Sequence, residues 1–471
     1  MLTALFAAAL LFLAIAIPAL IFVRPSRYER GQSTAAHALE LKRPLPQHNA
    51  SVQILVLGDI GRSPRMQYHA LSIAKHGGDV SIIGYTNSNV HPGLVDNRRV
   101  SIVPLPSPPK FLQTSANTFL FPLLAALKLL HQTWCLWLAL AYRSKPAQWM
   151  LVQNPPTAPT LVMAELVCKL RNTRLIIDWH NFGYSILALK LGQNHPMVKI
   201  NKSHESSFGR FSTAHFCVSH AMARQLRDDL KIEAPIHVLH DRPPALFQPV
   251  HSDEEKYKFL SSLPETADFV EDIKTGKCRL LVSSTSWTPD EDFSLLIKTL
   301  CRYSIFASTK EPDLPWLCVI ITGKGPQRQK YLAEIARLMS ENKDLPKKLL
   351  IKSAWLSFED YAQLLACASL GVCLHTSSSG VDLPMKVVDM FGAGLPVIGW
   401  NKYEAWPELV TEGVNGLGFG NDDELLAQLL DLFRGDGERL QVLRQGALLQ
   451  SKRRWDEEWD PVAGKLFAFN S

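Results

Sequence analysis

The sequence predicts an α/β protein in which two Rossmann-like domains follow one N-terminal transmembrane helix. Three observations lead to this prediction. An uncharged apolar run opens the chain, buried-strand patterns then alternate with helical patterns in two separate series, and a charged stretch with little periodicity separates the series. With 471 residues, of which 46% are hydrophobic and 20% charged, the chain is long enough for two buried cores.

The apolar run extends from Leu2 to Val23 and is long enough to cross about 30 Å of hydrocarbon as a helix. The first basic residue, Arg24, follows this run, and the positive-inside rule then keeps the rest of the chain in the cytosol. A secretory signal peptide is the alternative, but its basic residues would precede a shorter apolar stretch. The predicted boundaries are 1–24 for the anchor and 25–50 for a polar stalk.

The first αβ series occupies residues 51–245. An apolar run from Val52 to Leu57 enters a glycine turn, and a helical pattern over 64–76 follows, which together predict the opening βα unit of a parallel sheet. Further strand-like runs are predicted at 80–84, 100–103, 149–153, 175–178, 215–218 and 236–239. Segments with helical spacing separate several of these runs, which favours parallel strands with crossover helices.

Residues 110–142, inside this first series, are rich in Leu, Phe, Trp and Ala and carry few charges. The segment is too broken for a second membrane span. It is either a buried core helix or an interfacial segment that dips into a bilayer, and the sequence leaves both interpretations open.

The second αβ series occupies residues 279–450, after a charged linker predicted at 246–278 and before a C-terminal tail at 451–471. Its strands are predicted at 280–284, 317–322, 349–352, 370–374 and 396–399. Its helices are predicted at 291–302, 327–341, 358–367 and 384–393. This alternation is typical of a second doubly wound domain.

Charge and cysteine usage narrow the functional class. A net charge of +6 is too mild for a nucleic-acid-binding protein of this length and fits a membrane surface or an anionic small substrate. The eight cysteines are scattered through apolar segments without a CxxC pair, which predicts free thiols in a reducing compartment. Because no Asp-x-Asp cluster follows a strand, we expect no tightly bound metal, although Mg²⁺ could assist a diphosphate.

Two glycine turns follow predicted strands, and each is either a phosphate cradle or a plain tight turn. The first is Gly58-Asp59-Ile60-Gly61, and Arg62 and Arg65 after it could meet an anion. The second contains Gly323 and Lys324, where a nucleotide could lie against the strand's carboxyl end.

A loop rich in hydroxyl groups follows the predicted strand at 370–374 and leads into the helix that begins at Pro384. Its unpaired N–H groups suit a diphosphate, Lys386 would compensate charge, and Asp389 could accept hydrogen bonds from ribose hydroxyls. Asp382 is alternatively a helix cap. The small residues of the loop are Ser377, Ser378, Ser379 and Gly380.

Polar residues also follow the strand predicted at 175–178. Asp178, His180 and Asn181 lie among aromatic residues at the carboxyl edge of the first sheet, where α/β proteins bind ligands. This composition is typical of a sugar-binding edge.

Five segments together resemble the chitobiosyldiphosphodolichol β-mannosyltransferases, namely 58–70, 178–185, 283–293, 322–326 and 375–392. The resemblance covers nearly the whole chain after the anchor. It implies the GT-B fold, with two domains facing a cleft, a GDP-mannose donor and a dolichol-linked chitobiose diphosphate acceptor. It also implies a single-pass protein of the endoplasmic reticulum membrane that works in N-glycosylation beside other dolichol-pathway glycosyltransferases.

The sequence departs from the wider group of retaining GT-B enzymes at two places. Those enzymes carry a Glu-x7-Glu pair, whereas Asp382 and Asp389 have six residues between them. They also place an Arg and a Lys after the first strand of the second domain, where this chain has the hydroxylic and acidic segment 283–292. Lys386, Lys324 or Arg242 would then have to meet the diphosphate charge.

A β-mannoside made from an α-linked sugar nucleotide implies one inverting displacement with a general base. The base candidates are Asp59, Asp178 and His180. The donor-site candidates are Ser377, Ser378, Ser379, Gly380, Asp382, Lys386, Asp389, Gly323 and Lys324, and the acceptor-site candidates are Gly61, Arg62, Arg65 and Asn181. A non-catalytic scaffold subunit and a retaining transferase with another sugar nucleotide are the two alternatives.

Overall fold

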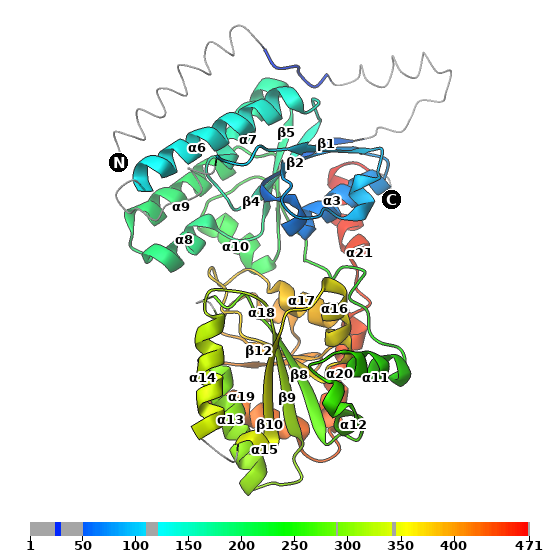
Figure 1. Cartoon of the computed structure of the whole chain (residues 1–471). Coiled ribbons are helices and arrows are strands. Elements are labelled where there is room, and N and C mark those ends of the chain that lie inside the picture. Colours follow the sequence, from blue (N-terminus) through cyan, green and yellow to red (C-terminus); the bar gives the residue numbers. More distant parts are fainter. Residues whose placement is uncertain (1–23, 30–49, 110–120, 289–290, 342–344, 470–471) are drawn as a thin grey trace, which may run out of the picture. The chain divides into compact units, whose positions relative to one another are not determined.

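The computed structural model describes residues 24–29, 50–109, 121–288, 291–341 and 345–469. The predicted anchor helix and most of the predicted stalk lie outside these residues. The chain forms two compact units, each around one parallel sheet, as the sequence predicts (Figure 1). The first unit holds the described residues up to Val218, Met222–Leu239 and those from Trp459 onward, and the second holds Ser219–Ala221 and His240–Glu458.

The sheet of the first unit has seven parallel strands in the order β3-β2-β1-β4-β5-β6-β7. The strands are β1 (Ser51–Asp59), β2 (Asp79–Tyr85), β3 (Val100–Pro104), β4 (Trp149–Asn154), β5 (Arg174–Trp179), β6 (Ala214–Cys217) and β7 (Ile236–Val238). Ile54, Leu55 and Val56 are fully buried, as expected for a strand covered on both faces. The strand order reverses between β1 and β4, which places a topological switch point at their carboxyl ends.

Helices connect these strands and carry the predicted membrane-associated segment. They are η1 (Ile60–Arg62), α3 (Pro64–Lys75), α4 (Pro92–Val95), α6 (Phe121–Leu138) with a π-helical extension η2 (Ala139–Arg143), α7 (Thr160–Arg171), α8 (Gly183–Leu191), α9 (Pro196–Gly209) and α10 (His220–Asp228). In α6, Leu136 and Trp137 are fully buried, whereas Leu127 is 40% exposed. The helix over Leu124–Arg143 has the length and composition of a membrane span and is one-third buried. The end of the helix therefore belongs to the core, while the stretch around Leu127 is partly exposed.

The sheet of the second unit has the order β10-β9-β8-β11-β12-β13. Its strands are β8 (Cys278–Ser284), β9 (Trp316–Thr322), β10 (Leu349–Ala354), β11 (Leu370–Cys373), β12 (Val397–Trp400) and β13 (Gly416–Phe419). The edge strand β13 is not predicted because it has only four residues, two of them glycine. Five strands of this sheet begin or end within two residues of their predicted bounds.

The helices of the second unit follow the predicted alternation, and the helix predicted at 291–302 starts two residues later and ends seven residues later than predicted. They are α13 (Phe293–Thr309), α14 (Arg328–Glu341), α15 (Leu345–Lys348), α16 (Phe358–Cys367), α17 (Met385–Gly392), α18 (Trp406–Leu409), α19 (Asp422–Phe433) and α20 (Glu438–Gln450). The Asp292 carboxylate accepts a hydrogen bond from the Ser294 N–H at 3.0 Å and so caps α13. This cap leaves Glu291 outside the helix, where it takes part in the candidate site.

Two predicted boundaries are wrong. The predicted linker at 246–278 contains α11 (Asp253–Ser262), η3 (Ala267–Phe269) and α12 (Val270–Lys274), and these pack on the second unit, where α11 contacts α16 and α12 contacts β8. The predicted tail is not a tail. At Trp459, the last residue of α21 (Trp455–Trp459), the chain returns to the first unit, which also holds η4 (Asp460–Gly464), and Trp459 and Phe467 are buried there.

Candidate functional site

The carboxyl edge of the first sheet is organised around Asp178, a buried residue of β5. Arg65 donates to its two carboxylate oxygens from Nε at 2.8 Å and Nη2 at 3.0 Å. His69 lies one helical turn after Arg65 on the same face of α3, and its Nε2 is 3.2 Å from Asp178 Oδ2. His180 adds its Nε2 at 3.0 Å from the same oxygen. The Asp178 carboxylate thus contacts three side chains, those of Arg65, His69 and His180.

These contacts set the charge of Asp178. Burial alone would raise its pKa, but the Arg65 guanidinium and the two histidines hold the pKa well below its usual range. Burial lowers the pKa of His69, and the Trp459 indole donates to His69 Nδ1 at 2.9 Å, which assigns the ring proton to Nε2. Asp178 is therefore a permanently charged anchor whose oxygens are occupied. This arrangement argues against its predicted role as the general base.

His180 has a different environment from its two neighbours in the network. Its side chain is 23% exposed, and its Nε2 faces Asp178. The carboxylate fixes the proton on Nε2 and leaves Nδ1 as the basic nitrogen, which is how an Asp–His pair prepares an imidazole for proton transfer. Of the three predicted base candidates, His180 has the geometry that fits best.

Asp59 and Gly61 serve the turn after β1. Asp59 Oδ1 accepts hydrogen bonds from the backbone N–H groups of Asn87 and Ser88, both at 3.2 Å. Burial would raise the pKa of Asp59, but the hydrogen bonds with Ser88 lower it. A Cβ at Gly61 would lie 2.5 Å from the Asn89 carbonyl oxygen. The close approach of this backbone explains the glycine, which favours the tight-turn interpretation over the phosphate cradle.

Among the predicted acceptor residues, Arg62 is exposed, whereas Arg65 and Asn181 already bind other groups of the protein. Arg62 is 81% exposed and contacts Ser88 Oγ at 3.3 Å, so its charge is available to a ligand. Arg65 is buried and bound to Asp178, which argues against its predicted role as a phosphate ligand. Asn181 Oδ1 accepts from the Phe182 N–H at 2.7 Å and from Ser185 Oγ at 3.3 Å, and so orders the start of α8.

In the second unit, Asp382 organises the loop after β11. Its carboxylate accepts from Ser377 Oγ, from Ser379 Oγ at 3.1 Å and from His375 Nε2 at 3.0 Å. Burial would raise the pKa of Asp382, but the His375 contact lowers it. The alternative role of Asp382 as the cap of α17 is wrong, because the residue before that helix is Pro384 and it has no side-chain cap. The serine hydroxyls point to Asp382, so they shape the loop.

Gly380 and Ser378 lie in the same loop, and the glycine allows a backbone turn that other residues rarely adopt. Gly380 has φ +77, a left-handed conformation that favours glycine, and its N–H donates to Ser377 Oγ at 2.7 Å. Ser378 is half-buried between these residues. Backbone geometry, more than serine hydroxyls, therefore decides what this loop can offer a diphosphate.

Lys386 forms an ion pair with Glu291, which is 1% exposed. Glu291 also accepts from Thr285 Oγ1 at 2.5 Å and from the Ser286 N–H at 3.0 Å. The segment 283–292, which lacks the basic residues of related enzymes, thus supplies an acid that fixes the direction of Lys386. With 24% of its side chain exposed, Lys386 remains accessible to an anion.

Asp389 is half-buried on α17 and holds an unusual charge state. Burial, together with the nearby carboxylate of Asp241, raises the pKa of Asp389 to about 8. Asp389 is therefore protonated at neutral pH and can both donate and accept a hydrogen bond. A neutral acid suits a vicinal diol and does not repel a neighbouring diphosphate.

The glycine turn after β9 is explained by packing. A Cβ on Gly323, which has φ +131, would lie 1.8 Å from the Thr285 carbonyl oxygen. The Trp287 indole donates to the Gly323 carbonyl at 3.1 Å and closes the contact between the two loops. Lys324 lies 4.0 Å from the centre of the Trp355 ring, which is 63% exposed. Its charge is therefore at the surface, while the glycine serves the connection between strand and helix.

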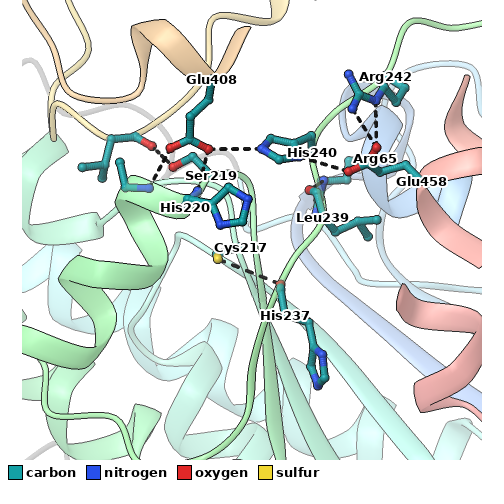
Figure 2. A network of polar contacts seen from close by, with 12 residues as sticks. Arg65, Cys217, Ser219, His220, His237, Leu239, His240, Arg242, Glu408 and Glu458 are labelled. Carbon is teal, nitrogen blue, oxygen red and sulfur yellow. Dashed lines mark hydrogen bonds and ion pairs between the residues drawn. The ribbon is translucent and has the colours of Figure 1, made fainter. Parts of the chain in front are cut away.

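A histidine cluster that the sequence does not predict lies in the second unit. Figure 2 shows His240 between Glu408 and Glu458, with ring nitrogen to carboxylate distances of 3.1 and 3.0 Å. Arg242 donates twice to Glu458, so this arginine already has a carboxylate partner, which argues against its expected role at a diphosphate. Burial would lower the pKa of His240, but the two carboxylates raise it, and the pKa of Glu458 falls to about 2.

The same cluster contains the one set of side chains in the described residues that has metal-ligand spacing. Ligand atoms of His220, His240 and Glu408 lie within 4.8 Å of one another. However, both ring nitrogens of His240 face carboxylates and its pKa is raised, so its favoured form is a doubly donating imidazolium. Because a metal requires a neutral imidazole, we interpret the cluster as a set of ion pairs and not as a metal site.

A cavity of about 610 Å³ lies at the opposite edge of the first sheet, where it is lined by residues such as Val52, Val80 and Val100 near strand beginnings. Ligands of open α/β sheets bind at the carboxyl ends of strands. The cavity is therefore not the candidate site.

The site residues that the sequence does not predict have contact partners far away in the sequence. His69, Glu291, Asp241 and Trp459 have no local pattern that marks them. A weak signal exists for His69 alone, since it stands four residues after Arg65 on a predicted helix.

Comparisons with known proteins identify the relatives of this chain. Residues 280–434 match the family model described as "Glycosyl transferases group 1". A chitobiosyldiphosphodolichol β-mannosyltransferase of Arthroderma benhamiae is 56% identical over 447 residues, with 95% of each chain covered. The human protein of the same name is 38% identical, with 96% of each chain covered. "UDP-glycosyltransferase TURAN" of Arabidopsis thaliana is 38% identical over 88% of this chain and 96% of its own.

Solved structures agree on the fold. The Anabaena protein HepE, in complex with UDP and glucose, superposes with a TM-score of 0.59 at 16% identity, covering 89% of this chain and 100% of its own. Sucrose-phosphate synthase of Thermosynechococcus elongatus gives 0.61 at 12% identity, covering 89% and 98%. At these identities the likeness supports the GT-B arrangement of two Rossmann-like domains and nothing finer.

Proposed function

Since this chain belongs to the family of chitobiosyldiphosphodolichol β-mannosyltransferases and is a glycosyltransferase, we propose that it transfers mannose from GDP-mannose to dolichol-linked chitobiose diphosphate. The new bond is β-1,4, and the product enters lipid-linked oligosaccharide assembly for N-glycosylation. The observation that carries the proposal is the 56% identity over 95% of the chain, a length that includes both candidate edges.

The proposed chemistry is a single inverting displacement. The O4 hydroxyl of the acceptor sugar attacks C1 of mannose, the bond from C1 to the phosphate oxygen breaks, and GDP leaves with the electron pair. The hydroxyl proton passes to His180 Nδ1, while Asp178 stabilises the imidazolium that forms. The Arg65 ion pair keeps Asp178 charged throughout and so keeps the imidazole oriented.

The proposed donor site lies at the carboxyl edge of the second sheet. Asp389, as a neutral acid, would hydrogen-bond the ribose hydroxyls, and Lys386, directed by Glu291, would meet the diphosphate charge. The N-terminus of α17 adds backbone N–H groups and a positive dipole end, because α17 follows the loop that Asp382 orders. Lys324 is an exposed cation of the same unit that would add to the positive charge, whereas Arg62 belongs to the first unit and is proposed for the acceptor diphosphate.

Three further parts of the proposal concern the surroundings of the reaction. The chain acts at the cytosolic face of the endoplasmic reticulum membrane, near other dolichol-pathway transferases, and protease protection in sealed microsomes tests this topology. The chain needs no resident cofactor. Mg²⁺ would assist only as a companion of the nucleotide sugar, which an EDTA titration measures.

The deciding experiment incubates the purified full chain with labelled GDP-mannose and lipid-linked chitobiose. We expect a labelled lipid product that β-mannosidase cleaves and α-mannosidase does not. A product cleaved by α-mannosidase would show a retaining transferase, and transfer from UDP-sugars alone would show the wrong donor. Absence of transfer from either nucleotide would favour the scaffold alternative.

A further inference from the structure

The helices α8 and α9 present apolar side chains to solvent. Ile186 is 37% exposed, Leu189 61% and Leu191 44%, all on α8, and Ile200 on α9 is 60% exposed. The two helices pack against each other and are joined through Gly192, whose φ of +85 suits a tight turn. We call Gly183–Gly209 the α8–α9 hairpin. Four exposed large aliphatic side chains on one hairpin require an explanation, because single ones are normal and clusters are not.

The exposed charges on the hairpin all have one sign. Lys190, Lys199 and Lys202 are exposed, and within the described residues none of them forms an ion pair. Lys202 lies 5.3 Å from the centre of the Tyr184 ring and so stays above α8. Between Asp178 and Glu205 the sequence contains no acidic residue. A solvated surface usually mixes both signs, whereas this one is apolar and basic.

The inner side of the hairpin is firmly held. Glu205 is fully buried and accepts from Thr157 Oγ1 at 2.7 Å, from Asn154 Nδ2 at 2.9 Å and from the Gly183 N–H at 2.8 Å. The hairpin therefore has a fixed start, and its exposed residues are not the result of loose packing.

The hairpin begins beside the candidate site. Gly183 follows His180 by three residues, and the nine residues of α8 span about 14 Å from there to Leu191. A surface that contacts Leu189 and Leu191 would therefore lie no further from His180, the proposed base, than about the length of α8.

We propose that the α8–α9 hairpin is a docking surface for a bilayer that contains anionic phospholipids. Aliphatic side chains enter the interface, and the lysines at their rim contact lipid phosphates, which is the composition of interfacial membrane helices. The exposed beginning of α6 extends the same character, since it carries Leu127 and Lys128 and no acid. α6 packs on α7 and α7 packs on α9, so these helices line one side of the unit (Figure 1).

This inference goes beyond the proposed reaction, and its test requires no turnover. The full chain carries the photoreactive amino acid p-benzoylphenylalanine at position 189 or, as a control, at position 449. Leu449 is 66% exposed on α20 of the second unit. Each protein is reconstituted into phosphatidylcholine vesicles with or without phosphatidylserine and irradiated, and adducts are identified by mass spectrometry.

We expect lipid adducts at position 189 that increase several-fold with phosphatidylserine, and none at position 449. Adducts between two copies of the chain at position 189 would show a self-association face, and equal lipid labelling at both positions would show unspecific contact. Either result overturns the proposal, as does the absence of any adduct at position 189.

The lysines are tested by the variant Lys190→Glu/Lys199→Glu/Lys202→Glu, which carries the label at position 189. The proposal predicts that this variant loses the phosphatidylserine dependence. The matched control, Lys258→Glu/Lys310→Glu/Lys330→Glu, reverses three exposed charges in the second unit and should keep that dependence. Melting curves of both variants establish that each is folded. An unchanged response in the hairpin variant would contradict the role of the lysines.

Discussion

Two aspartates at the carboxyl edges of the two sheets have opposite charge states. Asp178 in the first unit faces the Arg65 guanidinium at 2.8 Å, and its pKa lies well below the usual range. Asp389 in the second unit faces Asp241, and its pKa rises to about 8. Burial opposes ionisation at both positions, so the neighbouring charge makes the difference. The comparison teaches that one residue type serves as a charged anchor in one unit and as a neutral hydrogen-bonding acid in the other.

The largest effect should come from removing the charge of each aspartate. Asp178→Asn leaves the buried Arg65 without a counter-charge, and we expect a loss of about 3–5 kcal/mol in the free energy of unfolding. Asp389→Asn replaces a neutral acid by an amide of the same shape, and we expect a change below about 1 kcal/mol at about pH 4, where the acid is protonated in the folded chain and the unfolded chain gains little from ionisation. Denaturant unfolding of the solubilised full chain measures both. Equal losses in the two variants would remove the distinction between the two aspartates.

The variant His180→Ala tests whether His180, which Asp178 orients, is the general base. The variant should lower kcat by about 10²–10⁴-fold, the usual range for a lost general base, with little change in the KM for GDP-mannose. His180→Gln keeps a donor toward Asp178 but has no basic nitrogen, so we expect it to be equally slow. Steady-state kinetics with lipid-linked chitobiose provides the values. A raised KM at unchanged kcat would instead assign His180 to binding.

The variant Asp389→Ala tests whether Asp389 binds the ribose of GDP-mannose. Loss of a ribose contact that is equal in ground and transition states should raise the KM for GDP-mannose by about tenfold, or about 1.4 kcal/mol, at similar kcat. Asp389→Asn should keep most of the affinity, because an amide also donates and accepts. Asp423→Ala, at an exposed residue of α19, is the matched control. An unchanged KM in Asp389→Ala would refute the donor-site assignment.

The effect that is smallest at each step is a gradual loss of stability with rising pH. Because the pKa of Asp389 is raised to about 8, the folded chain binds this proton more tightly than the unfolded chain. The resulting stability is fully present below about pH 4 and is lost as pH rises toward 8, by at most about 1.4 kcal/mol per pH unit. Unfolding of the wild type and of Asp389→Asn between these values should diverge accordingly. Parallel curves would mean that Asp389 is already ionised.

The sequence predicts the strands well because buried parallel strands appear as continuous apolar runs. Val52–Leu57 lies within β1, and the run at 317–322 lies within β9. The short edge strand β13 has no such run. Helix bounds shift where a cap decides them, as Asp292 does for α13.

The candidate site is predicted in position but only partly in role. Asp178 and His180 stand after a predicted strand, so their place at the sheet edge follows from the pattern. That Asp178 is an anchor depends on Arg65 and His69, which belong to a helix much earlier in the chain. The charge state of Asp389 depends in the same way on Asp241. Such pairings are set by tertiary structure, and local spacing carries no trace of them.

The return of residues from Trp459 onward to the first unit has a consequence for biosynthesis. A ribosome makes the strands of the first unit early, but Trp459 and Phe467, which belong to its core, emerge only after the second unit. The Trp459 indole also fixes the His69 proton that faces Asp178. The nascent chain must therefore carry an unfinished first domain while the whole second domain is translated, and the segment that starts at Trp459 decides when the Asp178 network closes. Such a chain exposes apolar surface to chaperones during synthesis, and a stop codon shortly before Trp459 would damage the domain made first.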